Sequence, residues 1–225
     1  CFFSVISSMV TTKTSSCFTA VNLKHCLLVS SPYHCSKLAV TPVSAAGPCT
    51  GSTFTVTITV DPTPVVPAQT ATICDGGTFT VTPTNHPTST IIPSGTTYSW
   101  SAPTVTGISG TAAGSGSANI SGTLTNSTSA PINVVYTVTP TSGAAGACVG
   151  STFTTTVTVN PTPALSSTLA PAAICSGATF GYTATSATVA SSGSVVMTWS
   201  RATVAGISEA ATTGTGNISE VLTNT

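Results

Sequence analysis

Cys49-Thr-Gly-Ser-Thr-Phe-Thr-Val-Thr-Ile-Thr-Val-Asp-Pro-Thr-Pro64 is a stretch in which apolar side chains alternate with threonine. Phe54, Val56, Ile58 and Val60 occupy every second position of it. Because successive side chains of a strand point to opposite faces, one face of this segment is apolar and the other carries hydroxyl groups. The pattern predicts a half-buried antiparallel strand.

Alternation of this kind recurs along the chain, and each run is bounded by Gly, Pro, Asn or Ser. The further runs are Phe79 and Val81; Tyr98 and Trp100; Val134, Tyr136 and Val138; and Phe153, Val157 and Val159. No segment has a convincing helical period. Several short strands separated by turns predict an all-β fold, a two-sheet β-sandwich. The expected core residues are Trp100, Trp199, Phe79, Phe180, Tyr136 and Phe153.

The chain also repeats itself. The opening stretch returns 99 positions later as Cys148 to Pro163. Four more landmarks return in order: Ile73-Cys74 as Ile174-Cys175, Trp100 as Trp199, Gly107-Ile-Ser109 as Gly206-Ile-Ser208, and Leu124-Thr-Asn126 as Leu222-Thr-Asn224. We therefore expect tandem sandwiches of about 99 residues, joined by Pro-rich linkers at 61–64 and 160–163.

These landmarks divide the chain into four parts. Residues 41–60 hold the last strand or strands of a partial repeat, 61–160 a complete repeat, and 161–225 a partial repeat that lacks its final strands. Residues 1–40 do not match the repeat and hold four of the eight cysteines. They are interpreted either as a distinct N-terminal tail or as a stretch wrongly assigned to the chain. Cys1 could be a lipidated residue, although no signal peptide precedes it.

Charge is scarce in this sequence. The 225 residues include four Lys or Arg and four Asp or Glu, and the net charge is zero. No basic face for nucleic acid can be built from so few cations. Outside residues 1–40 the ionisable groups are scattered, so we expect no enzyme, no cofactor and no metal site. No stretch is long enough to span a bilayer.

The ordered motifs resemble the PKD-like repeats of the immunoglobulin-like class. They are Ile-Cys-Ser-Gly-x-Thr-Phe from Ile174, Thr-Trp-Ser from Thr198, Gly-Ile-Ser, Leu-Thr-Asn-Thr from Leu222, Tyr-Thr-Val-Thr-Pro from Tyr136, and Cys-x-Gly-Ser-Thr-Phe before Asn-Pro-Thr-Pro. The resemblance covers about residues 41–225. It implies an extracellular, non-catalytic module of secreted Bacteroidota surface proteins, of the kind exported with the gliding and type IX secretion apparatus. The Asp-rich turn of better known PKD domains is absent here, so their metal binding is not carried over.

The cysteines of the matching region recur in register, two in each unit. In a secreted β protein this points to disulfides, with Cys49, Cys74, Cys148 and Cys175 as the candidates. Cys74 with Cys148 is the first pairing considered, and the second is Cys49 with Cys74 and Cys148 with Cys175. His25-Cys26 and His34-Cys35 could bind a metal by residue type alone. Asn119, Asn126 and Asn217 begin N-glycosylation patterns, which are often matched by chance.

The boundaries suggest a mode of assembly. The chain begins with the final strand of a unit and ends before the last two strands of another, so each partial repeat lacks what the other has. One hypothesis is that residues near 51–60 of one copy, with a strand near 37–42 before them, complete the partial repeat 161–225 of the next, head to tail, with Phe54, Val56, Ile58 and Val60 as inter-subunit residues. The other is that the sequence is an excerpt of a longer repeat protein.

The expected function is therefore structural: an extracellular filament or stalk on a bacterial surface. Its partners would be further copies of itself, with surface glycans or other cells as further contacts of the hydroxyl-rich faces. The alternative is that the repeats are spacers of a long adhesin whose binding tip lies elsewhere. Threonine rows that bind ice or a crystalline polysaccharide rank below both, because sandwich sheets are twisted.

Overall fold

A computed structural model describes residues 22–26, 34–43, 49–86 and 89–225, and strands are the regular elements of those residues, with no helix. This confirms the prediction of an all-β chain. Two compact units divide at Pro62 and Thr63. The expectations for Cys1, and for the rest of 1–21, concern residues outside those described.

The first unit contains one antiparallel sheet of three strands in the order β1-β2-β3. Its strands are β1 (Asn22–Cys26), β2 (His34–Val40) and β3 (Phe54–Val60). Val40 pairs with Phe54, and Leu38 pairs with Val56. The structure thus places strands inside residues 1–40, which were expected to be separate from the repeat.

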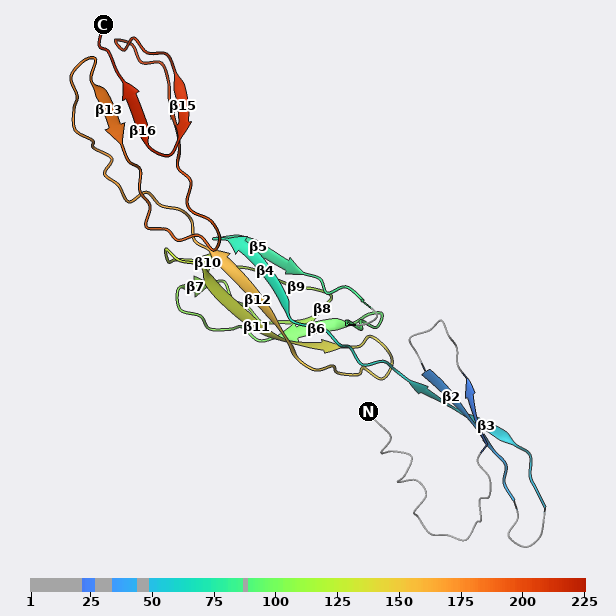
Figure 1. Cartoon of the computed structure of the whole chain (residues 1–225). Coiled ribbons are helices and arrows are strands. Elements are labelled where there is room, and N and C mark those ends of the chain that lie inside the picture. The colour runs from blue at the N-terminus through green and yellow to red at the C-terminus, as the bar shows by residue number, and fades with distance from the viewer. Residues whose placement is uncertain (1–21, 27–33, 44–48, 87–88) are drawn as a thin grey trace. The chain divides into compact units, whose positions relative to one another are not determined.

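The second unit begins with the central sandwich, residues 63–163. Its larger sheet has five strands in the order β4-β12-β11-β6-β8, which lie side by side in Figure 1. They are β4 (Gln69–Cys74), β6 (Thr97–Trp100), β8 (Gly114–Ser117), β11 (Ile132–Thr141) and β12 (Phe153–Asn160). β4 and β12 run parallel, whereas the other neighbours are antiparallel. Because β4 and β12 are the first and last strands of the sandwich and run in the same direction, the chain enters the sandwich at one end and leaves it at the other.

Two short antiparallel pairs form the second layer of this sandwich. β5 (Thr78–Val81) pairs with β9 (Ile120–Thr123), and β7 (Ile108–Ser109) pairs with β10 (Thr125–Asn126). The layers meet through aromatic side chains, with the Phe79 and Tyr136 ring centroids 5.5 Å apart. Phe79, Tyr136 and Phe153 are buried in this core, as are Ile120, Leu124 and Val157. Burial raises the pKa of the Tyr98 and Tyr136 phenols, because it disfavours the charged form.

Trp100 was expected in the core, and it packs against the core cluster from the side of the sheet edge. It pairs with Val138, whose side chain is buried, but Trp100 itself is only partly buried. The reason is that its other neighbour is β8, the edge strand of the sheet. There a Cβ at Gly114 would collide with the Trp100 indole, so glycine makes room for the ring.

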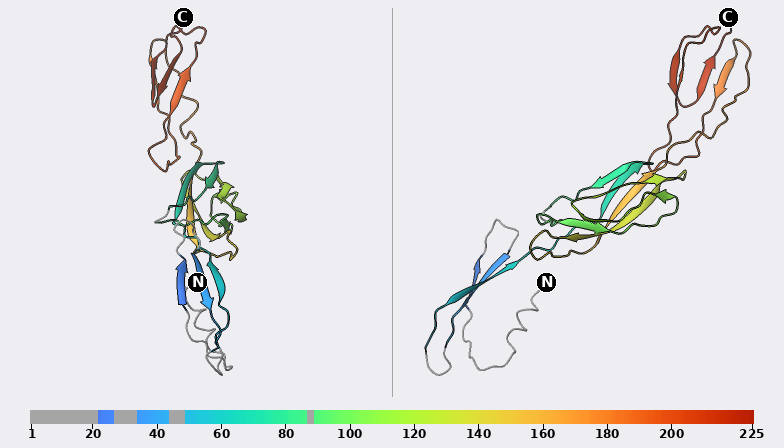
Figure 2. Two further views of the ribbon diagram at one scale, coloured as in Figure 1. Left: turned by 90° about the vertical axis from the view of Figure 1, so that its right-hand side faces the viewer. Right: turned by 180° about the vertical axis from the view of Figure 1, so that it is seen from behind.

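The C-terminal half-sandwich, residues 164–225, contains two antiparallel pairs. β13 (Thr179–Tyr182) pairs with β16 (Ile218–Val221), and β14 (Thr198–Arg201) pairs with β15 (Thr212–Thr215). They are the orange and red strands of Figure 2. None of its residues reaches full burial, so Phe180 and Trp199, expected in a core, are only partly buried.

Candidate functional site

β3 carries an exposed apolar face. Phe54, Val56, Ile58 and Val60 are 53%, 40%, 43% and 51% exposed, respectively. The residues between them are exposed as well, because the three-stranded sheet of the first unit has no second layer among the described residues. An exposed strand with a row of β-branched and aromatic side chains is a surface that another chain can bind.

The strand equivalent to β3 in sequence is β12, and β12 is buried. Phe153, Val157 and Val159 stand at the positions of Phe54, Ile58 and Val60, and they are 6%, 0% and 0% exposed. The two strands therefore share a sequence pattern but lie in different environments. The difference is the second layer, which covers β12 and is missing over β3.

The hairpin β2–β3 has the same pairing register as the hairpin β11–β12. Val40 pairs with Phe54 as Val138 pairs with Phe153, and Leu38 pairs with Val56 as Tyr136 pairs with Thr155. The hydrogen bonds beyond the strands also agree. The Gly51 N–H donates to the Pro42 carbonyl at 2.8 Å, and the Gly150 N–H donates to the Pro140 carbonyl at 2.9 Å. Residues 34–43 and 49–60 thus reproduce the backbone pairing of the last two strands of the central sandwich.

In the half-sandwich, the apolar residues of the interior are only partly covered. Phe180, Ile218 and Leu222 are only partly buried, whereas their sequence equivalents Phe79, Ile120 and Leu124 are 2%, 0% and 0% exposed. In the central sandwich, β11 and β12 supply six of the twelve buried hydrophobic residues. The described residues 164–225 contain no strands equivalent to those two, so the half-sandwich lacks that part of a core.

Polar contacts hold the half-sandwich together at its rim. Arg201 Nε donates to both carboxylate oxygens of Glu220, at 3.2 and 3.1 Å, and Arg201 Nη2 donates to the Ala210 carbonyl at 2.7 Å. The Glu209 carboxylate accepts the Thr223 N–H at 2.9 Å. That bond lowers the pKa of Glu209 to about 2, because it favours the ionised form.

Asp75 lies in the turn after β4, where the central sandwich meets the linker. Its Oδ1 accepts the Asn126 N–H at 2.8 Å, and its Oδ2 accepts the Thr162 hydroxyl at 2.9 Å. In the half-sandwich Ser176 takes the place of Asp75, and its Oγ accepts the Asn224 N–H at 2.9 Å. Both residues therefore fix a turn.

Asn126 is the buried centre of this turn and a poor acceptor for a sugar. Its Nδ2 donates to the carbonyls of Ala130 and Val159, at 2.8 and 2.9 Å, and the residue is 3% exposed. Glycosylation needs that amide nitrogen accessible, so the Asn126 pattern is a chance match in the folded chain.

The pairing of Cys74 with Cys148 is wrong for this fold. Cys74 pairs with Asn160, at the end of β12. Cys148 lies beyond the other end of that strand, where Val149 bridges to Thr141. The eight residues of β12 span about 25 Å, whereas the Cα atoms of a disulfide lie within about 7 Å. Cys49, Cys74 and Cys175 are exposed thiols outside any disulfide.

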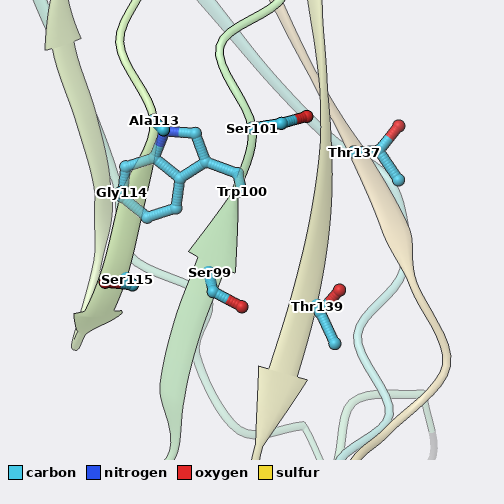
Figure 3. A pocket seen from close by; sticks show the side chains of 8 residues that line it. All are labelled: Ser99, Trp100, Ser101, Ala113, Gly114, Ser115, Thr137 and Thr139. Atoms are coloured by element: carbon cyan, nitrogen blue, oxygen red, sulfur yellow. The ribbon is translucent and has the colours of Figure 1, made fainter.

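A hollow of about 620 Å³ lies over β6, β8 and β11 of the central sandwich. Figure 3 shows the Trp100 indole lying across β8 at Gly114, with Ser99 and Thr139 beside it. Ser101, Ala113, Ser115 and Thr137 complete the lining. A similar hollow of about 420 Å³ adjoins Trp199. Neither lining contains a carboxylate, an amine, an imidazole or a thiol, so the hollows offer hydroxyl contacts but no acid or base.

Groups that carry chemistry are dispersed over the part of the chain that the structure describes. No cluster of three His, Cys, Asp or Glu residues that could hold a metal occurs there. The side chains of His25, Cys26, His34 and Cys35 lie outside the described set. Within the same limits, the structure contains no helix that could cross a bilayer.

Comparison with known families agrees with the architecture. The fold class is an all-β sandwich, and residues 71–163 match the family model of the PKD-like domain. This span runs from β4 through β12 to the linker, which is the central sandwich almost entirely. No curated protein matches the chain.

Sequence reasoning placed a strand near residues 37–42, and the structure shows β2 beginning earlier, at His34. It missed the Arg201–Glu220 ion pair, whose partners lie 19 positions apart and have no equivalents in the central sandwich.

Proposed function

We propose that this chain is an extracellular structural protein, a subunit of a cell-surface filament or stalk. The observation that carries the proposal is the central sandwich, which matches the PKD-like domain over residues 71–163. Domains of this kind are typically extracellular immunoglobulin-like modules, and they are generally not catalytic. The scattered ionisable groups of the described residues support the same reading.

Tandem repetition of a unit of about 99 residues is part of this proposal. It is supported by matching contacts in the two halves of the second unit. Trp199 pairs with Gly214 as Trp100 pairs with Gly114. The Gly177 N–H donates to the Leu222 carbonyl, as the Gly76 N–H donates to the Leu124 carbonyl.

The low charge of the chain fits a crowded surface structure. Only 4% of the residues are charged and the net charge is zero, so copies that lie side by side repel each other little. The resemblance of the motifs to repeats of Bacteroidota surface proteins supports the proposal of a filament or stalk on a bacterial cell, with surface glycans or neighbouring cells as proposed contacts.

The second candidate function is that of spacer repeats in a long adhesin. It is favoured by the Pro-rich linker after Asn160, which joins one sandwich directly to the next. In that case the binding tip is a different domain, and the repeats set its distance from the cell.

Cryo-electron microscopy of native material tests both candidates. We expect a filament in which separate copies of the chain recur along the axis. Separate rods, or density that continues from one repeat into many others of a single chain, would support the spacer instead. An isolated globular protein with neither rods nor filaments would contradict the structural role as a whole.

A further inference from the structure

The central sandwich and the half-sandwich belong to one compact unit, Thr63–Thr225, and hydrogen bonds run between them. We propose that these bonds form a fixed joint, in which the loop 185–191 of one sandwich docks on the end of the sandwich before it. The partner of the loop is therefore the neighbouring module of the same chain. The inference rests on the proposed structural function, because it states how consecutive modules of a stalk would keep a constant orientation.

The linker between the two sandwiches is held at each of its first three residues. The Asn160 carbonyl accepts the Asp75 N–H at 2.7 Å, and the Thr162 hydroxyl donates to Asp75 Oδ2 at 2.9 Å. Pro161 lies between them and is buried. Its ring fixes the φ angle of that residue. Because a hinge needs residues whose φ and ψ angles can change, this linker is poorly suited to be one.

The loop 185–191 makes two backbone hydrogen bonds to the central sandwich. The Val189 N–H donates to the Ser129 carbonyl at 2.7 Å, and the Ser191 N–H donates to Asn160 Oδ1 at 3.2 Å. Ser129 lies in the turn between β10 and β11, whereas Asn160 is the last residue of β12. The loop therefore contacts two different elements of the central sandwich. Contacts at separate places oppose rotation of one sandwich against the other as well as their separation.

The docking loop is attached to the first residues of its own sandwich. The Ser186 hydroxyl donates to the Ala164 carbonyl at 2.7 Å, and the Ala164 N–H donates to the Thr188 hydroxyl at 3.0 Å. The Ser166 N–H donates to the Thr185 carbonyl at 2.7 Å. Because the loop is bonded to its own sandwich on both strands of this contact, a bond made by its far end holds the half-sandwich and not the loop alone.

The receiving turn of the central sandwich is fixed by one buried side chain. Asn126 is 3% exposed, and its Nδ2 donates to the Ala130 and Val159 carbonyls at 2.8 and 2.9 Å. Its Oδ1 accepts the Thr128 hydroxyl at 2.8 Å. Ser129 lies between Thr128 and Ala130, so Asn126 positions the carbonyl to which the loop binds. A turn that is already ordered loses little conformational entropy when the loop docks.

Hydrogen exchange of the full chain, dispersed below any concentration at which it assembles, tests the joint. We expect the Val189 and Ser191 amides to exchange at least about tenfold more slowly than in an unstructured peptide. The double variant Asn160→Ala, Thr162→Val removes the Oδ1 acceptor and the linker hydroxyl. It should speed exchange at Val189 toward the unstructured rate, although neither substitution removes the Ser129 carbonyl. Thr162→Val alone, at an exposed position, should show part of this effect.

The matched control removes the same two kinds of group away from the joint. Asn119→Ala, Thr78→Val deletes an amide and a hydroxyl whose hydrogen bonds lie within the central sandwich. Exchange at Val189 should then equal that of the natural chain. The Ser166 N–H, which donates to Thr185 inside the half-sandwich, should stay protected in both double variants and shows that the half-sandwich remains folded.

Nitrogen-15 relaxation measures the joint at the level of whole modules. Two sandwiches that are joined tumble as one body, so the amides of β11 and of β16 should report the same rotational correlation time. In the Asn160→Ala, Thr162→Val variant the two values should differ and both should fall. The control variant should keep the single value of the natural chain.

The outcomes separate this inference from the proposed function. Unprotected Val189 and Ser191 amides in the natural chain, or different correlation times for its two sandwiches, would overturn the joint. So would exchange at Val189 that the joint variant leaves unchanged, because the loop would then be held within its own sandwich. Filaments or rods in native material would still support the structural role in each of these cases. An isolated globular protein with a fixed joint would contradict that role and leave the joint in place.

Discussion

At the scale of single residues, two carboxylates each hold a loop to a neighbouring segment. Asp75 accepts hydrogen bonds from Asn126 and Thr162, and Glu209 accepts one from Thr223. Neither carboxylate has a sequence equivalent in the other sandwich, since Ser176 and Gly110 stand there. The two sandwiches therefore hold equivalent loops in place with different side chains.

Replacement of Asp75 measures the contribution of its turn. We expect Asp75→Ala to lower the free energy of unfolding by about 1–2 kcal/mol, because the Asn126 N–H and the Thr162 hydroxyl lose their acceptor. Asp75→Ser should lose less, since Ser176 accepts the equivalent N–H in the half-sandwich. Urea unfolding of both variants at neutral pH provides the comparison. Equal loss for the two variants would show that the Asn126 bond contributes nothing.

Glu209 should make the half-sandwich sensitive to acid. Its pKa is lowered from 4.5 to about 2 in the folded chain, so the unfolded chain binds the proton more readily. The stabilisation is therefore present above about pH 4.5 and is lost as the pH falls toward 2. We expect Glu209→Gln to remove that part of the pH dependence. Thermal melts from pH 6 to about pH 2 test this, with Glu209→Asp as the variant that keeps the charge. An unchanged acid profile in Glu209→Gln would contradict the role of the Thr223 bond.

At the scale of strands, alternation predicted β3, β5, β11 and β12, because one apolar face against one hydroxyl face is a strong signal. A strand near residues 37–42 was also predicted, but the first residues of β2 were not, because His34 and Ser36 break the apolar alternation of the sequence there. The environment of a strand was not predictable from its own residues. β3 and β12 have nearly the same sequence, and only the presence of a second layer decides which is buried.

This contrast leads to a matched pair of substitutions. We expect Val157→Ala to lower the free energy of unfolding by about 2 kcal/mol, because it leaves a cavity in a core where Val157 is fully buried. Ile58→Ala in the dilute, unassembled chain should change it by less than about 0.5 kcal/mol, since Ile58 remains exposed. Urea titrations at low and high protein concentration make the measurement. A large loss for Ile58→Ala in the dilute chain would mean that β3 is already covered within one copy.

At the scale of the whole molecule, five ordered landmarks in the sequence indicate a repeat. The sequence also predicts the apolar face of β3, but it does not predict whether that face is covered. The sequence placed Phe54, Val56, Ile58 and Val60 on one face, and the structure shows that face uncovered. Whether two cysteines can form a disulfide depends on which end of a strand each of them lies at. That follows from the parallel pairing of β4 and β12, which alternation alone does not specify.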